Sequence, residues 1–237
     1  MSEDLSREEI EQALDRAVEE LLTAAQVTAP PVDALRIARN HLGMTVSLVS
    51  DSPPRRRPQS PVPGKPIVLH AEESEERRQW AVAQAIGTHC KPDLLRRLGV
   101  APDQARTLGG ASLINQFAGH LLVPTAWFAA DARATGYDLL ELKSRYRTAA
   151  HETLADRLLD LPEPSIITVV DDSRVLRRRS NAWRVRRELE PAERTCQQYV
   201  STHSRPHVIR ADGWTVQGWP IPQSDSQRVI LRSVVEE

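Results

Sequence analysis

Apolar residues recur at helical spacing near the start of the chain and at alternating spacing soon afterwards. Ser6 and Glu9 form a capping-box pattern ahead of an apolar helical run, which should end before the first pair of adjacent prolines. A second short helix is predicted for the segment VDALRIARNHLG, with Gly43 as its stop. The alternating run that follows predicts a strand over about residues 44–50.

The next part of the chain holds a proline-rich stretch and then several helices. Residues 53–66 contain six prolines, which predicts a solvated loop. The segment PIVLH predicts a strand over 66–70, and a helix is predicted from about Ser74 to Cys90 because its acidic first turn suits the helix dipole. A turn is expected at Pro92. Further helices are predicted for DLLRRLG, ASLINQFAGHLLV, WFAADARATG, DLLELKSRYR and HETLADRLLDL.

The pattern changes in the last third of the chain. From Ser165 onward there are β-branched runs such as IITVV and VILRSVV and the turn signal Asp212-Gly213, with one helical segment, PAERTCQQYVSTH. This change predicts two domains, one over residues 1–162 and a small β-rich module over residues 163–237. The expected fold class is therefore α+β.

Composition and charge are those of an ordinary globular protein. Hydrophobic residues make up 40% and charged residues 27%, which argues against disorder, and no apolar run approaches the roughly 20 residues of a membrane-spanning helix. The N-terminus, MSEDLSREEIEQ, is acidic where a signal peptide would be basic, so we expect a cytoplasmic protein with no membrane partner. The net charge of -1 argues against a dedicated nucleic-acid binder, and Cys90 and Cys196 cannot build a disulfide framework.

Two segments resemble the ImmA/IrrE family of zinc-dependent endopeptidases. The first is IVLHAEESEERRQWAVAQAIGTHC, in which residues 74–78 resemble the SEERRRF motif that precedes the HExxH helix of that family. The resemblance covers about residues 5–162 and implies a zincin-like helical domain with a short β-sheet. The second segment is NQFAGHLLVP, which is similar to the family's AN-x-FA-x-LL-x-P stretch at Asn115, Phe117, Ala118, Leu121, Leu122 and Pro124.

A zinc peptidase of this kind needs particular groups at particular positions. Two histidines spaced i, i+4 bind the metal from one helix face, the glutamate between them takes a proton from zinc-bound water, and a carboxylate from another helix completes the ligands. By the resemblance, the equivalent positions here are Gln84, Ala85, Thr88 and Leu113. Neutral amide and hydroxyl oxygens are poor zinc ligands, and alanine cannot activate water. We therefore predict no catalytic residue and no cofactor, although zinc would be expected of the active family.

Two further features of the same helices have alternative interpretations. Gly87 stands where the family motif has a glycine, and because glycine costs a helix about 1 kcal/mol relative to alanine, it predicts a packing role, such as the close approach of another backbone. A displaced metal site could be built from His89, Cys90 and His120. However, His89 lies one residue beyond the family's ligand position, which turns it about 100° away on a helix. A helix end with a polar histidine and a buried thiol is therefore the favoured interpretation.

The strongest charged feature is RVLRRRSNAWRVRR, residues 174–187, which contains seven arginines and no acid. Such a segment could contact the phosphates of a nucleic acid or an acidic protein. The alternative is a solvated hairpin with arginines outward and Val175, Leu176, Trp183 and Val185 inward. The acidic ELEPAE that follows favours this intramolecular interpretation. The candidate basic patch comprises Arg177, Arg178, Arg179, Arg184, Arg186 and Arg187.

The leading hypothesis is a catalytically inactive ImmA/IrrE-like pseudo-peptidase with a regulatory role. It would bind a protein partner, such as a helix-turn-helix transcription regulator, in the groove where substrate lies in the family. The residues expected at this groove are Gln84, Thr88, Asn115 and His120. The two alternatives are an active metallo-endopeptidase with displaced metal ligands and a nucleic-acid-binding protein that uses the arginine-rich segment.

Overall fold

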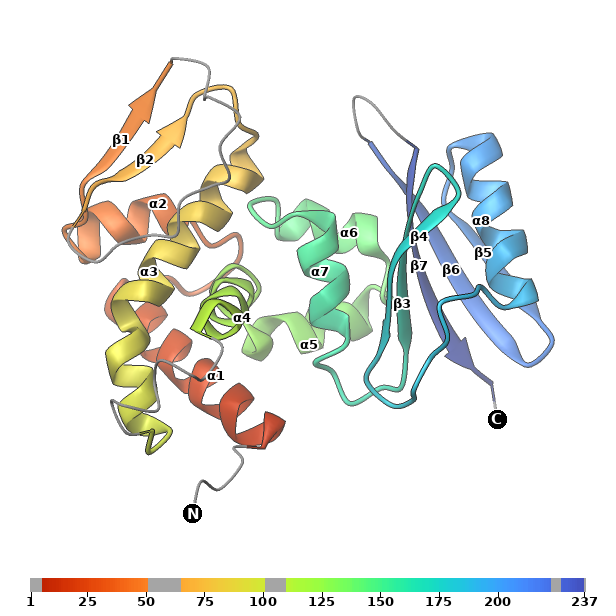
Figure 1. The fold of residues 1–237 in the computed structure, drawn as a ribbon, viewed down its shortest axis with the longest axis horizontal. Helices are drawn as coiled ribbons and strands as arrows, with labels where there is room; N and C mark the ends of the chain where they lie inside the picture. The colour runs from red at the N-terminus through yellow and green to blue at the C-terminus, as the bar shows by residue number, and fades with distance from the viewer. Residues whose placement is uncertain (1–5, 51–64, 101–109, 223–226, 237) are drawn as a thin grey trace. The chain divides into compact units, whose positions relative to one another are not determined.

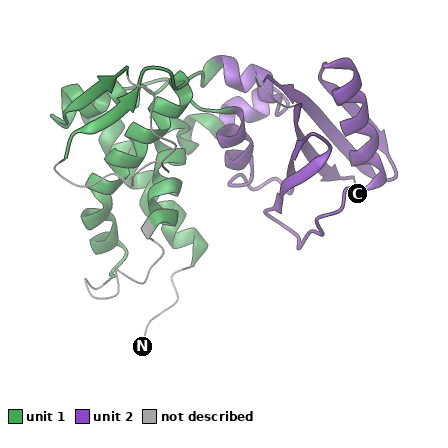
Figure 2. Ribbon diagram, turned by 45° about the horizontal axis from the view of Figure 1, so that its top comes forward, with its two compact units in different colours: residues 1–128, 145–150 green, residues 129–144, 151–237 purple. Residues whose placement is uncertain are grey.

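A computed structural model describes residues 6–50, 65–100, 110–222 and 227–236. The fold is mixed α+β, as predicted, and the chain forms two compact units (Figures 1 and 2). Unit 1 comprises residues 1–128 and 145–150, and unit 2 comprises residues 129–144 and 151–237. The elements are α1 (Arg7–Ala24), α2 (Ala34–Arg36), η1 (Ile37–His41), β1 (Val46–Val49), β2 (Ile67–His70), α3 (Glu75–Arg97), α4 (Gly110–Leu122), α5 (Thr125–Ala134), α6 (Leu139–Arg145), α7 (His151–Leu158), β3 (Ile166–Asp171), β4 (Arg174–Ser180), α8 (Pro191–His203), β5 (His207–Ala211), β6 (Trp214–Ile221) and β7 (Arg228–Val235).

Helix α1 begins as the capping box predicts. The Ser6 hydroxyl accepts a hydrogen bond from the Glu9 backbone N–H at 3.2 Å, and the Glu9 carboxylate accepts one from the Ser6 backbone N–H at 2.8 Å. The inner face of the helix buries Leu14 and Val18, which are 0% and 2% exposed. The predicted first helix is thus confirmed together with its cap.

Helix α3 is longer than the sequence predicts. The predicted turn at Pro92 is wrong, because α3 runs through this proline to Arg97. A proline in a helix interior removes one hydrogen bond and costs about 3 kcal/mol. Leu94 and Leu95 are buried on the part of the helix beyond it, and their burial offsets this cost. Even α3, with its 23 residues, is too polar to cross a membrane, and no other helix of the described residues is long and apolar enough.

Strands β1 and β2 confirm the two strands predicted in the N-terminal part. They pair in parallel, with Val46 opposite Ile67 and Val49 opposite His70, and form a two-stranded sheet. Most of the predicted proline-rich loop between them falls within residues 51–64, outside the described residues.

The second sheet lies in unit 2 and confirms the β-rich character predicted for the last third of the chain. Its five strands are antiparallel in the order β4-β3-β7-β6-β5. Two-residue turns join β3 to β4 and β5 to β6, and all four turn residues have positive φ, between 44° and 75°. This is the geometry of the hairpin turns that favour Asp, Asn and Gly, and it applies to Asp172, Ser173, Asp212 and Gly213.

Helices cover both faces of this sheet (Figure 1). Helix α8 packs on one face, where Cys196 and Val200 join strand residues such as Val216 and Leu231 in a buried cluster. Gly218 permits this close packing, since a Cβ there would lie 2.8 Å from the Cys196 sulfur. On the other face lies α7, and the indole of Trp219 donates to the Asp138 carboxylate at 3.3 Å.

The compact units differ from the domain limits expected from the sequence. Residues 129–144 and 151–162 were expected in the N-terminal domain but belong to unit 2. The physical reason is that their helices cover a sheet formed by residues much later in the chain. The domain limits 1–162 and 163–237 stay a prediction about folding units.

Candidate functional site

Helices α3 and α4 bring together residues from the two signature segments. The Gln84 amide on α3 donates to the Asn115 side-chain oxygen on α4 at 2.7 Å. Gln84 is half-buried and Asn115 is exposed, so the pair lies at the surface edge of the contact between the helices. Thus two of the four residues expected at the groove are in direct contact.

The donor groups at these positions do not fit a zinc ion. The Thr88 hydroxyl donates to the Gln84 backbone oxygen at 2.9 Å, one turn back on its own helix. The Gln84 side chain is engaged with Asn115, and Ala85 is a buried methyl that is 3% exposed. Leu113 has no donor atom in its side chain. Zinc prefers thiolate, imidazole and carboxylate ligands, and none of the four positions supplies one.

Gly87 allows the two helices to approach closely. A Cβ at this position would lie 2.9 Å from Cδ1 and 3.3 Å from Cβ of Phe117, whose side chain is fully buried. A packing role for this glycine was predicted, and the structure shows one. The neighbour is an aromatic side chain, however, and not the backbone that was expected.

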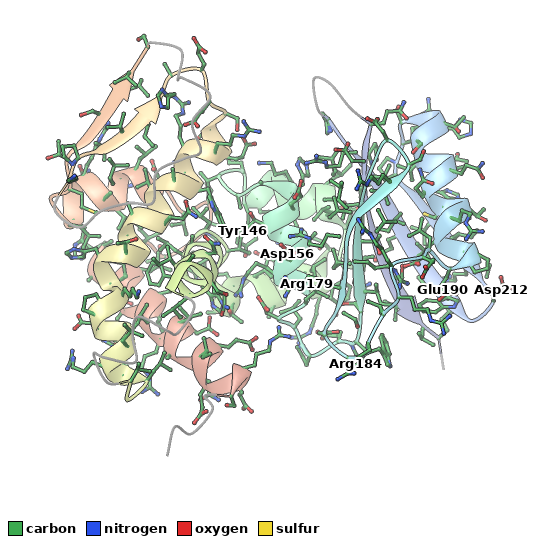
Figure 3. All side chains as sticks on the ribbon, viewed as in Figure 1. Tyr146, Asp156, Arg179, Arg184, Glu190 and Asp212 are labelled. Atoms are coloured by element: carbon green, nitrogen blue, oxygen red, sulfur yellow. The ribbon has the colours of Figure 1, made fainter. Side chains whose placement is uncertain are left out.

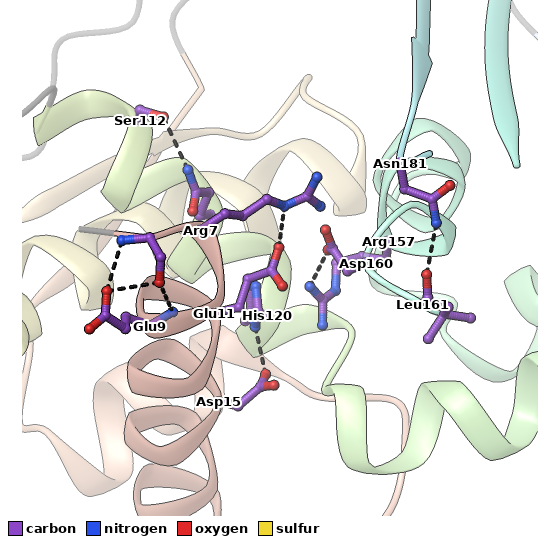
Figure 4. A network of polar contacts seen from close by, with 12 residues as sticks. Arg7, Glu9, Glu11, Asp15, Ser112, His120, Arg157, Asp160, Leu161 and Asn181 are labelled. Carbon is purple, nitrogen blue, oxygen red and sulfur yellow. Dashed lines mark hydrogen bonds and ion pairs between the residues drawn. The ribbon is translucent and has the colours of Figure 1, made fainter. Parts of the chain in front are cut away.

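His120 belongs to a polar cluster with α1 (Figure 4). Its ring is buried, and Nδ1 lies 2.7 Å from a carboxylate oxygen of Asp15. The hydroxyl of Thr125 donates to the same oxygen at 2.7 Å. The carboxylate therefore orients the imidazole and the hydroxyl together, and it ties α4 and the start of α5 to α1.

The other residues of the possible displaced metal site, His89 and Cys90, lie on α3 directly after Thr88. His89 is exposed and Cys90 is half-buried, and burial raises the pKa of the Cys90 thiol to about 11. A thiol with this pKa is protonated at neutral pH, and the metal-binding form is the thiolate. Across the described ranges, no group of three or more His, Cys, Asp or Glu side chains is placed to hold a metal ion. The displaced metal site stays a prediction.

The arginine-rich segment forms β4 and the connection to α8, and a β-bulge sets the direction of its side chains. Val170 pairs with Val175 and Val169 pairs with Arg177, so Leu176 is an extra residue that shifts the alternation by one. As a result Arg177 faces α7, where it forms an ion pair with Asp156 at 2.8 Å. Arg178 faces α8, where it meets Glu193 at 2.8 Å.

The Arg178–Glu193 pair is buried, with side chains 3% and 0% exposed. The Glu193 carboxylate also accepts hydrogen bonds from the Ser233 hydroxyl at 2.7 Å and from the Glu190 backbone N–H at 2.9 Å. The Arg178 guanidinium also donates to the Arg186 backbone oxygen at 2.8 Å. This cluster holds the arginine segment onto the first turn of α8.

The predicted orientation of this segment is therefore partly wrong. Leu176 and Trp183 were expected inward but are 46% and 42% exposed, whereas Arg178 was expected outward and is buried. For Leu176 and Arg178 the bulge is the physical reason, because one extra residue inverts the faces after it, whereas Trp183 lies beyond the end of β4 at Ser180. Arg187 donates to the Val175 backbone oxygen at 2.8 Å, so three of the six candidate arginines have partners within unit 2. Arg179, Arg184 and Arg186 are exposed.

Comparisons with known proteins find a likeness among solved structures. No protein-family model matches the chain, and no curated protein matches it. Among solved structures, a Mycobacterium tuberculosis transcriptional regulator is similar, with a TM-score of 0.70 at 17% sequence identity, over 96% of this chain and 81% of that chain. At this level of sequence identity, the likeness shows a shared fold and nothing further.

Two acidic residues at these sites were not singled out from the sequence. Asp15 lies on α1, about a hundred residues from His120 in the chain, and no local pattern connects the two. Glu193 could have been found, because it follows an arginine run and is the third residue of a helix that begins with proline. An acid at that position often caps its own helix, and here it also neutralises an arginine.

Proposed function

We propose that this chain is a non-catalytic, ImmA/IrrE-like regulatory protein that binds a protein partner such as a helix-turn-helix transcription regulator. The observation that carries the proposal is the α3–α4 pair. Gly87 against Phe117 and Gln84 against Asn115 keep the two signature segments together, while the expected ligand positions hold no imidazole or carboxylate. Helices α3 and α4 pack closely but lack the ligands that a zinc peptidase needs for hydrolysis. This combination favours a role in binding a partner over a role in catalysis.

The regulatory setting is supported by the structural likeness. The similar solved protein is described as a transcriptional regulator, and its fold is shared over nearly the whole of this chain. We extend that role to this chain as part of the proposal. The exposed side of the Gln84–Asn115 contact offers neutral hydrogen-bonding groups to a partner.

A ligand-restoration experiment tests whether α3 and α4 have the geometry of a zinc site. The triple variant Gln84→His/Thr88→His/Leu113→Glu restores two imidazoles and a carboxylate and leaves the buried Ala85 unchanged. The matched control is Glu20→Ala/Asp93→His/Arg97→His, an i, i+4 histidine pair at exposed positions of the same helix, in which the carboxylate that pairs with Arg97 is removed. We expect the triple variant to bind zinc about 100-fold more tightly than the control, as measured by competition with a chromogenic chelator.

Equal, weak zinc affinity in the two variants would contradict the family resemblance. The unmodified chain, purified without chelators, is expected to contain no stoichiometric metal by elemental analysis. Bound zinc or manganese that is lost on substitution of His89 or His120 would instead establish the alternative, an active metallo-endopeptidase with displaced ligands.

If a helix-turn-helix regulator is encoded next to this protein's gene, it is the first partner to test. We expect a complex by isothermal titration calorimetry, and we expect Asn115→Lys to weaken it about tenfold or more because the substitution places a charge in the contact. Asn40→Lys, at an exposed position of η1, is the matched control. If both variants bind as the unmodified chain does, the α3–α4 surface is not the partner site.

The nucleic-acid alternative remains a second candidate, carried by the exposed arginines. Its test is a salt titration of duplex and single-stranded DNA binding with Arg179→Ala, which leaves the buried Arg178–Glu193 pair intact. Binding at low salt with a slope that this variant reduces would favour the alternative over the protein-binding proposal.

A further inference from the structure

Unit 2 contains a hollow of about 380 Å³ on the α8 side of its sheet. Its walls come from β3, β4, the connection between β4 and α8, the start of β6 and the end of β7. We propose that this hollow binds a small anion that carries a flat ring, such as a nucleoside monophosphate or an aromatic carboxylate. Its wall includes Arg178, Trp183, Arg184, Arg186, Glu190 and Trp214.

The two tryptophans supply surfaces on which a flat ring can stack. Trp183 is 42% exposed even though its indole is one of the largest apolar groups in the chain. Trp214 is half-buried and packs against the core cluster under α8, which holds it in place. Aromatic ligands stack on such indoles with little selectivity for the identity of the ring.

The charged groups at the hollow favour an anion. Arg184 and Arg186 are exposed, and Arg184 projects from the connection between β4 and α8 (Figure 3). Within the described part of the chain, neither guanidinium has a hydrogen bond or an ion pair. The acid at the rim, Glu190, is already engaged, because its carboxylate accepts the Glu193 backbone N–H at the start of α8.

The wall also contains a buried donor without an acceptor. The two terminal nitrogens of Arg178 donate hydrogen bonds to the Arg186 backbone oxygen and to the Glu193 carboxylate. Its Nε is buried and has no hydrogen-bond partner among the described residues. An unsatisfied buried N–H is costly, and a ligand oxygen would relieve that cost. A guanidinium pairs well with carboxylate and phosphate oxygens.

The size of the hollow restricts the ligand class. A volume of about 380 Å³ is at the lower end of the range for small-molecule sites, roughly 300–1,000 Å³. One ring system with one anionic group fits this range. The inference rests on unit 2 alone and does not depend on the proposed role of α3 and α4.

The test is a titration of the ¹⁵N-labelled full chain followed by the indole N–H signals in proton–nitrogen correlation spectra. Trp183→Phe and Trp214→Phe assign the two signals. Adenosine 5′-monophosphate and indole-3-acetate represent the two sources of the anion, and adenosine and inorganic phosphate separate the contributions of ring and charge. We expect saturable shifts of both signals with at least one of the two anions, and weaker binding of adenosine and of phosphate.

Charge variants decide whether the hollow is the site. We expect Arg184→Ala/Arg186→Ala to weaken binding about tenfold or more, because two cationic contacts are lost. The matched control Arg174→Ala/Arg205→Ala removes the same charge at exposed positions outside the wall and should leave the affinity unchanged. Equal weakening by the two variants would mean nonspecific attraction and would overturn the proposal.

Two other results also overturn it. One is the absence of shifts at Trp183 and Trp214 with both anions at millimolar concentration. The other is much tighter binding of a single-stranded oligothymidylate with a steep salt dependence, which would make this surface a nucleic-acid site instead.

Discussion

The ring of Phe117 occupies the space that a side chain at position 87 would need. Alanine would improve helix propensity by about 1 kcal/mol, but its Cβ would meet a fully buried ring at 2.9 Å. Overpacking of this kind costs about 1–3 kcal/mol. We therefore expect Gly87→Ala to lower the free energy of unfolding by up to about 2 kcal/mol, as measured by urea denaturation.

The control for this prediction is the same substitution in a Phe117→Ala background. Alanine removes the Cγ and Cδ1 atoms that would lie 3.3 Å and 2.9 Å from the added Cβ, so Gly87→Ala should there be neutral or stabilising. Equal destabilisation in both backgrounds would show that the ring is not the cause.

The buried carboxyl of Asp156 should make the free energy of unfolding of unit 2 vary with pH in the acidic range. Burial raises the pKa of its carboxyl, and the nearby Arg177 and Arg179 oppose that rise only in part. One of its oxygens is buried without a hydrogen-bond partner in the described residues, which is consistent with this direction. The folded chain therefore retains the proton to higher pH than the unfolded chain does. The contribution of Asp156 to the free energy of unfolding should thus fall as pH rises from the ordinary aspartate pKa to the raised value.

Asp156→Asn removes this titration. The free energy of unfolding of the variant minus that of the unmodified chain should increase through the acidic window and stay constant above it. Urea denaturation at a series of pH values measures this difference, and Asp212→Asn in an exposed hairpin turn controls for the substitution itself. A difference that falls with rising pH would mean that the arginines lower the pKa of Asp156.

At the scale of single elements, α3 shows how burial can override a local signal. Pro92 indicates a helix end in the sequence, yet the helix continues because Leu94 and Leu95 are buried beyond it. Pro92→Ala restores a backbone hydrogen bond to Thr88, worth about 3 kcal/mol in a helix interior. Loss of the proline also frees the unfolded chain, which costs about 0.4–1 kcal/mol.

The net expectation for Pro92→Ala is stabilisation by about 2 kcal/mol in thermal or urea unfolding. Lys91→Ala, at the preceding position, should change stability by less than about 0.5 kcal/mol. Pro92 is exposed, so a destabilised Pro92→Ala variant would mean that the greater freedom of the unfolded chain outweighs the restored hydrogen bond.

Strand β4 and helix α8 are joined by a buried ion pair. Arg178→Met leaves the Glu193 carboxylate buried without its cation, and breaking such a pair costs about 3–5 kcal/mol. Arg177→Met removes an arginine whose side chain is 34% exposed, so its ion pair contributes only about 0–1 kcal/mol. Urea unfolding of both variants checks this contrast, and similar losses in the two would contradict it.

The elements themselves could largely be predicted from the sequence, because their signals are local. The capping box, the alternation of strands and the hairpin turn at Asp212-Gly213 each involve residues a few positions apart. The direction of the arginine side chains could not be predicted, because a single bulge residue, Leu176, inverts the alternation and leaves no mark in the composition.

At the scale of the whole molecule, unit 2 is discontinuous in the chain. Its sheet lies after residue 165, but the helices on one of its faces come from residues 129–144 and 151–158. Without these helices, the side chains of Trp219 and Ile230, which are 2% and 0% exposed, would become accessible to solvent.

We therefore expect a fragment of residues 129–237 to fold cooperatively and a fragment of residues 163–237 to remain expanded. Urea denaturation and binding of a dye specific for exposed apolar surface measure the difference. A cooperative transition in the shorter fragment would confirm the domain boundary predicted from the sequence.

The sequence by itself determined the order of helices and strands, the α+β class and the lack of imidazole and carboxylate at the expected zinc positions, because these follow from residue types and short spacings. Only the tertiary structure decided which distant groups meet. It paired Gln84 with Asn115, His120 with Asp15 and Arg178 with Glu193, and it placed two tryptophans and three arginines around one hollow. Such contacts depend on helix packing and strand register, which the local pattern of a single chain does not specify.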